Sequence, residues 1–200
     1  MELRGKNIGI GFAASHCTFE EVMPQFERLV EKGANVIPVV SSNIRDTKFG
    51  EAAKWLKRLK EVTGNELITT VVEAEPLGPK KVLDLFLIAP CTGNTLSRLA
   101  NAITDGPILM AAKATLRNQR PVVLAVSSND LLGLNAVNLA RLLSAKNVYF
   151  IPFGQDDPVN KPNSMVAKME LVPETLEMAL DGRQLQPIIV PYGAHRSASV

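Results

Sequence analysis

Short apolar runs alternate with amphipathic helical patterns along the chain, and this alternation limits the possible folds more than any other feature. The strand-like runs cover 7–12, 36–40, 67–72, 84–89, 122–126 and 148–151. The helical patterns cover 18–32, 49–62, 95–102, 107–117, 135–144 and 174–180. This order predicts an α/β fold with a doubly wound parallel sheet, a flavodoxin-like or Rossmann-like three-layer sandwich. We expect one domain over 1–190 and a C-terminal tail over 191–200.

The size, charge and cysteine content of the chain argue against several classes of protein. Its 200 residues are enough for one domain with a sizeable core. A formal net charge of +2 is too small to indicate nucleic acid or an acidic membrane surface as the main partner. No apolar run approaches the length of a transmembrane helix, and the first residues lack the apolar segment of a signal peptide. Cys17 and Cys91 are the two cysteines, which fits a reducing cytosol, and we predict no metal site.

The segment after the fourth predicted strand has the composition of a ligand-binding loop. The apolar run over 84–89 is expected to end at Pro90, and a helix is expected from Thr95. Open α/β sheets bind ligands where a strand ends in small residues before a helix. Gly93 would let the backbone approach a ligand closely, while Thr92, Asn94 and Thr95 would add short donors and acceptors. The alternative is an ordinary strand-to-helix turn that Asn or Thr caps.

The loop after the first predicted strand raises the question of a dinucleotide site. Residues 9–14 match G-x-G-x-x-A, the dinucleotide fingerprint. However, the next helix is expected to begin at Thr18, seven residues after Gly11, whereas in the fingerprint it begins within the motif. The second strand ends in Ser41 and Ser42, with no carboxylate to bind a ribose. Both departures argue against a dinucleotide.

The same loop suits a single phosphate better. Ala13, Ser15 and His16 belong to a run of small or polar residues before the helix, so backbone N–H groups and the Ser15 hydroxyl could point at an anion. Ser41 and Ser42 should lie at the end of a neighbouring strand and could complete the site. A glycine-rich turn without any ligand is the alternative.

The motif Ala-Pro-Cys-Thr-Gly-Asn-Thr at 89–95, followed by a helix and Thr104-Asp105, resembles the signature of the flavoprotein family of FMN enzymes. That family includes phosphopantothenoylcysteine decarboxylase, peptidyl-cysteine decarboxylases and flavin prenyltransferases. The resemblance implies FMN as the cofactor, with its phosphate and ribityl chain in the first loop. It further implies a homo-oligomer, a trimer or a multiple of one, whose sites are closed by residues of neighbouring subunits. The 155–162 arm is too polar and Pro-rich to be core, so we expect this arm or the Asp105 helix to contribute to a neighbour's site. The cofactor-binding residues we predict are Gly11, Ala13, Ser15, His16, Ser41, Ser42, Ala89, Pro90, Thr92, Gly93, Asn94, Thr95, Ser127 and Asn129.

Four further stretches narrow the resemblance to a branch found in endospore-forming bacteria: 11–18, 74–81, 118–138 and 149–158. Members of that branch are subunits of an enzyme that makes an aromatic pyridine dicarboxylate. The resemblance implies oxidation of a dihydro- or hydroxytetrahydropyridine dicarboxylate in the cytoplasm of the sporulating mother cell. It also implies a second, different subunit whose own Rossmann domain binds NADP.

Three residues are candidates for the chemistry. His16 could exchange a proton near neutral pH, and Asn94 could hydrogen-bond a flavin carbonyl or the substrate. Asp105 could lie near the flavin, or could simply cap the helix over 107–117. The cysteine decarboxylases carry a His just before the strand that leads to the Pro-Asn loop. Residues 78–82 contain none, which argues against decarboxylation, although Lys80 and Lys81 could pair with substrate carboxylates or form an exposed basic turn.

Overall fold

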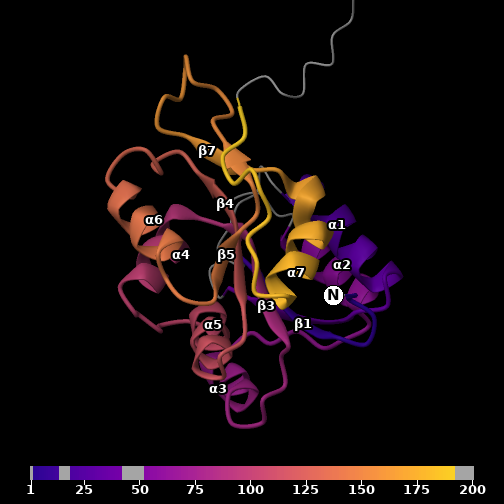
Figure 1. Ribbon diagram of the computed structural model, residues 1–200. Coiled ribbons are helices and arrows are strands. Elements are labelled where there is room, and N and C mark those ends of the chain that lie inside the picture. The colour runs from indigo at the N-terminus through magenta and orange to yellow at the C-terminus, as the bar shows by residue number, and fades with distance from the viewer. Residues whose placement is uncertain (1, 14–18, 42–51, 192–200) are drawn as a thin grey trace, which may run out of the picture.

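The computed structural model describes residues 2–13, 19–41 and 52–191, and its centre is a twisted, mainly parallel sheet (Figure 1). The parallel strands lie in the order β2 (Asn35–Val40), β1 (Asn7–Phe12), β3 (Leu85–Cys91), β4 (Val122–Ser128) and β5 (Val148–Phe150). The helices α1 (Phe19–Glu31), α2 (Ala52–Thr63) and α7 (Val172–Leu180) cover one face. The other face carries α3 (Val71–Ala74), α4 (Gly93–Ala100), α5 (Pro107–Arg117) and α6 (Ala136–Leu143). The predicted doubly wound three-layer sandwich is confirmed.

A small antiparallel hairpin extends the sheet at the carboxyl end of β4, and the sequence patterns did not indicate it. The strands β6 (Phe153–Gly154) and β7 (Met165–Ala167) pair with each other, and β7 also pairs with β4 at Ser127 and Ser128. Residues 155–164, which contain the predicted 155–162 loop, connect β6 to β7 and project beyond the sheet (Figure 1). The polar arm therefore lies at the edge where the parallel strands end.

The predicted third strand over 67–72 is wrong. Only Ile68 pairs with the sheet, through one parallel bridge in which Val40 N donates to Ile68 O (2.8 Å) and Ile68 N donates to Pro38 O (2.9 Å). Thr70 then begins α3 through a capping box: Glu73 N donates to Thr70 Oγ1 (3.2 Å), and Thr70 N donates to Glu73 Oε2 (3.0 Å). The Thr-x-x-Glu pattern is a helix-start signal that outweighed the β-branched residues around it.

Pro90 does not end β3, contrary to the sequence prediction. The strand continues to Cys91, and the Ala89–Pro90 peptide bond is cis. The pairing of β3 with β4 shifts register between Ile88 and Cys91. A proline lacks the N–H needed for a regular ladder, and such an irregularity is a position where a sheet accepts one.

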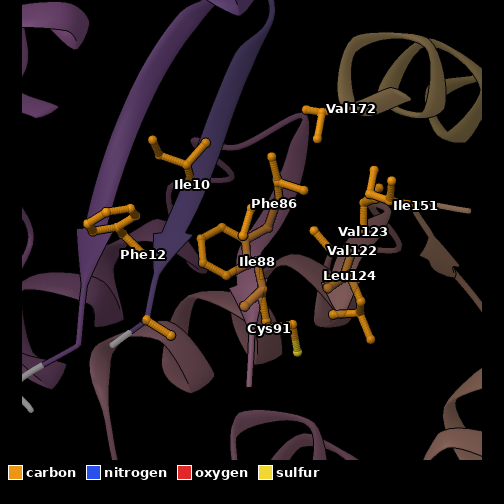
Figure 2. Packing of buried hydrophobic residues seen from close by; sticks show 14 of the residues in the cluster. Ile10, Phe12, Phe86, Ile88, Cys91, Val122, Val123, Leu124, Ile151 and Val172 are labelled. Carbon is orange, nitrogen blue, oxygen red and sulfur yellow. The ribbon is translucent and has the colours of Figure 1, made fainter. Parts of the chain in front are cut away.

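The core lies between the sheet and its two helical layers, and the G-x-G of β1 is part of it. Figure 2 shows Phe86 of β3 among the buried side chains of β1 and β4. A Cβ on Gly9 would lie 2.6 Å from Phe86 Cδ2, and one on Gly11 would lie 3.0 Å from Phe86 Cζ and 2.9 Å from Ile108 Cγ2. Both glycines therefore make room for core side chains. A bulky residue at Gly11 would therefore disturb the core.

Candidate functional site

The predicted binding loops meet at one edge of the sheet because the strands that lead to them are parallel. Ala13 follows β1, Ser41 follows β2, Thr92 follows β3 and Asn129 follows β4. The helices after β1 and β3 lie on opposite faces, so the crevice between these strands is the switch point where open α/β sheets bind ligands. Ser15, His16 and Ser42 fall outside the described residues.

Thr92 caps α4, which begins two residues earlier than the sequence pattern indicated. Its Oγ1 accepts a hydrogen bond from Thr95 N (3.3 Å) and lies 3.1 Å from Thr95 Oγ1. The ordinary capping alternative is therefore what Thr92 does in this structure. Asn94 is exposed in the first helical turn, where its amide is open to a ligand.

Gly93 brings the start of α4 against the loop after β4. A Cβ at this position would lie 2.7 Å from Ser128 Oγ and 3.1 Å from Asn135 Nδ2. The close approach that the glycine permits is thus an approach to protein groups. This close packing holds the loop that carries Thr92 against the loop that carries Asn129.

A chain of hydrogen bonds stiffens the loop after β4. Asp130 N donates to Ser128 Oγ (3.3 Å), and the Asp130 carboxylate accepts from Leu134 N (3.1 Å) and Asn135 Nδ2 (3.1 Å). Asn138 Nδ2 then donates to Asn135 Oδ1 (3.0 Å). Asp130 was not among the predicted site residues, although an Asp directly after Ser-Ser-Asn at the end of a strand is a common turn-forming signal.

One opening at this edge, which we call the main cavity, has a volume of about 580 Å³. It brings together the predicted residues Thr92, Gly93, Ser127 and Asn129. The other residues that line it are Glu21, Ser128, Asp156, Lys161, Ser164 and Val166. Helix α1 and the β6–β7 arm therefore contribute charged groups that the local motifs could not reveal. A second cavity of about 570 Å³ shares Glu21, Asp156 and Val166 with the main cavity.

A smaller opening, the small cavity, lies beside the start of α5 and has a volume of about 220 Å³. Ser41, Thr95, Arg98 and Asp105 line it together with the first residues of the helix. Asp105 does not cap α5: the cap is Gly106, which makes no side-chain capping bond, and Asp105 Oδ2 lies 3.6 Å from Arg98 Nε. The capping alternative for Asp105 is therefore wrong.

The remaining predicted cofactor-binding residues among those described are buried. Gly11, Ala13, Ala89 and Pro90 have little exposed surface, so only their backbone could face a ligand. Cys91 beside them is also buried, and burial raises the pKa of its thiol to about 12. That thiol is therefore neutral and unreactive at neutral pH.

Other sequence-based candidates lie away from this edge. Lys80 and Lys81 are exposed just before β3, at the opposite end of the strand from these loops, which favours the exposed basic turn over pairing with substrate carboxylates. Within the described ranges, no group of three or more acidic, His or Cys residues could hold a metal ion. No helix in that part of the chain is long and apolar enough to cross a membrane.

Comparison with known proteins agrees with this fold. The flavoprotein family model matches residues 1–180. The chain is 62% identical over 190 residues to the B subunit of dipicolinate synthase from Bacillus subtilis (strain 168), covering 94% of this chain and 95% of that protein. The crystal structure of the dipicolinate synthase B subunit from Bacillus halodurans C superposes with a TM-score of 0.89 at 54% identity, covering 96% and 99% of the two chains.

A more distant structure, the FMN-dependent cysteine decarboxylase SpaF, shares the fold alone. It has a TM-score of 0.64 at 17% identity and covers 88% of this chain and 98% of its own. The family model spans most of the chain, and the Bacillus subtilis relative spans nearly all of it. The chain belongs to the flavoprotein family.

Proposed function

We propose that this chain is the FMN-binding B subunit of a dipicolinate synthase. In this role it acts with the A subunit of that enzyme to oxidise dihydrodipicolinate, or its hydroxytetrahydro precursor, to dipicolinate. The observation that carries the proposal is the main cavity at the carboxyl ends of β3 and β4, lined by hydroxyl and amide groups. The identity of 62% to a protein that bears the name of this subunit supports the choice of reaction.

The described residues fit a flavin mononucleotide. The small cavity offers Ser41, Thr95 and Arg98 beside the uncapped start of α5, which are groups suited to a single phosphate. The main cavity offers Ser127 and Asn129 as hydrogen-bonding groups for the flavin ring or the substrate. Ser15, His16 and Ser42 complete the proposed set from outside the described residues.

When bound, the flavin would supply the redox chemistry, because it can accept the two electrons that the substrate loses. The chain would orient both molecules: the hydrogen bonds of Asp130 hold the loop with Ser127 and Asn129 in one conformation, and Gly93 fixes that loop against α4. Asn94 would donate a hydrogen bond to a flavin carbonyl or the substrate, and His16 remains our candidate for proton exchange. Asp105 lines the small cavity and is paired there with Arg98, so it would contact the flavin in that cavity.

The A subunit would bind NADP in this scheme, because the described residues of this chain offer no dinucleotide site of the usual kind. The two glycines of β1 accommodate Phe86, Leu83 and Ile108, and β2 ends at Val40, followed by Ser41 and not by a carboxylate. We further propose a homo-oligomer, a trimer or a multiple of one, in the cytoplasm of a sporulating mother cell. Exposed apolar side chains around the arm and the loop after β4, namely Leu132, Leu134, Val137 and Val159, are consistent with assembly at this edge.

Two alternatives from the same family remain as outcomes of the test. One is an FMN-dependent decarboxylase, and the other is a non-catalytic subunit that keeps the fold without flavin. The absorbance spectrum of the purified chain separates the synthase subunit and the decarboxylase, which both bind flavin, from the flavin-free subunit, because bound FMN gives its own visible bands. The substrate is then incubated with the chain, in the presence and absence of NADP and the A subunit. The products separate formation of dipicolinate from release of carbon dioxide.

A further inference from the structure

The arm between β6 and β7, residues 155–164, has a defined internal structure. Asp157 holds a turn in which Asn160 N donates to Asp157 Oδ1 (3.1 Å) and Lys161 N donates to Asp157 O (2.8 Å). Hydrogen bonds from Asn160 lower the pKa of Asp157, so this carboxylate stays charged as the acceptor of the turn. Gln155 Nε2 donates to Pro162 O (2.9 Å) and closes the base of the arm. These bonds fix the backbone at Lys161.

The arm is also attached to the loop that lines the main cavity. Leu132 N, in the segment after β4, donates to Asn163 O (3.1 Å). The strand β7 that follows the arm pairs with Ser127 and Ser128. The position of Lys161 is thereby tied to the same strand end that carries Asn129.

Lys161 supplies the positive charge of the main cavity within the described part of the chain. The other charged residues that line it, Glu21 and Asp156, are acidic. The Nζ atom of Lys161 lies 3.7 Å from Asp156 Oδ2, and 60% of the Lys161 side chain and 32% of the Asp156 side chain are exposed. An ion pair of this length and exposure is weak, so Lys161 can exchange its partner at little cost.

We propose that Lys161 binds a carboxylate of the pyridine dicarboxylate, and that Asp156 is the counter-ion which it leaves when the substrate enters. This inference rests on the proposed function. A dianionic ligand in a cavity with two acidic side chains needs a cation near it. Ser127, Ser128 and Asn129 can hydrogen-bond a carboxylate but cannot offset its charge. A flexible lysine at the rim can follow the ligand from solution into the cavity.

The test uses variants with opposite expected effects. Pyridine-2,6-dicarboxylate serves as the probe, titrated calorimetrically into the flavin-loaded chain by itself and in complex with the A subunit. Lys161→Met should weaken binding about 10-fold, as expected for loss of a charge-assisted contact. Lys161→Arg should retain it. Asp156→Asn should tighten binding about 3-fold, because it removes a competing anion, on the scale of a partly exposed ion pair.

Three controls make the result specific. Lys80→Met removes an equal charge at the opposite end of β3 and should leave binding unchanged. The neutral analogue pyridine-2,6-dicarboxamide should respond little to any of the substitutions. Far-UV circular dichroism and the flavin spectrum verify that each variant is folded and loaded.

Two results would overturn the role of Lys161: Lys161→Met binds the dicarboxylate as tightly as wild type, or Lys161→Met and Asp156→Asn both weaken it. The second would mean that the ion pair only stabilises the arm. The inference is also overturned if the wild-type chain fails to bind the dicarboxylate, both by itself and in the complex. Its flavin spectrum and product analysis then decide separately whether the proposed function fails.

Discussion

Gly11→Ala should destabilise the fold through the Phe86 ring, whether or not flavin is present. The new Cβ would lie 2.9 Å from Ile108 Cγ2 and 3.0 Å from Phe86 Cζ. Ordinary carbon–carbon contacts are about 3.5–4.0 Å, so both side chains must move by roughly 0.5–1 Å. Overpacking of this kind costs about 1–3 kcal/mol.

One effect opposes this cost. Alanine loses less conformational freedom than glycine on folding, which contributes about 0.4–1 kcal/mol of stability where the backbone angles suit it. We therefore expect a net loss of about 1–2 kcal/mol in the free energy of unfolding, from these two opposing effects. For a chain of this length, that corresponds to a decrease in Tm of roughly 2–8 °C.

Urea unfolding of the flavin-free chain, followed by far-UV circular dichroism, measures the loss. Gly78→Ala is the matched control, because its Cβ would lie 3.3 Å from Ala114 Cβ and needs only a small adjustment. Phe86→Leu shortens the side chain that meets the new methyl group, so the double variant should be more stable than the sum of the single effects by about 1 kcal/mol. If Gly11→Ala unfolds like wild type but loses flavin affinity, the glycine keeps space for the ligand and our reasoning is refuted.

Other parts of the structure should respond to substitution and to chemical labelling in ways that their contacts determine. Glu73→Gln should lower stability at neutral pH, because backbone hydrogen bonds from Thr69 and Thr70 lower the pKa of the Glu73 carboxyl group. The stabilisation from this carboxylate is fully present above its pKa in the unfolded chain and disappears as the pH falls through its pKa in the folded chain. Urea titrations of both proteins at several pH values would detect the difference. Asn135→Ala should cost about 1–3 kcal/mol, since it leaves the Asp130 carboxylate without one donor, and chemical unfolding against an exposed Asn→Ala control measures this. Cys91 should resist iodoacetamide at pH 8 in the native chain and react after denaturation, because burial raises its pKa to about 12; mass spectrometry would reveal rapid native labelling if this is wrong.

The sequence was most informative where long periodic segments form the sheet and its helices. The expected bounds of β1 and of α5 agree with the structure, since a run of apolar residues defines the first and Pro107 starts the second. The β6–β7 hairpin could not be predicted from periodicity because its strands have only two and three residues. Their pairing depends on the end of β4, which is distant in sequence.

The candidate site shows the same difference between local and long-range information. The loop over 89–95 was recognisable from its small polar residues, and the structure places Thr92 and Gly93 in the main cavity. Glu21, Asp156 and Lys161 line that cavity from other elements, and no local motif indicates which charged residues a fold will bring together. The capping box at Thr70 and Glu73, by contrast, was visible in the sequence and should have outweighed the apolar run around it.

The G-x-G of β1 explains how packing can favour one class of nucleotide over another. In a dinucleotide site, the second glycine leaves space for a pyrophosphate beside the strand. Here the Phe86 ring and Ile108 occupy the space beside Gly11, so the face toward α5 offers no room for two phosphates in the usual place. Space for a ligand remains beyond these side chains, in the small cavity of about 220 Å³ that Ser41 and the start of α5 line. That volume and its donors are the place that our proposed function assigns to the single phosphate of a mononucleotide.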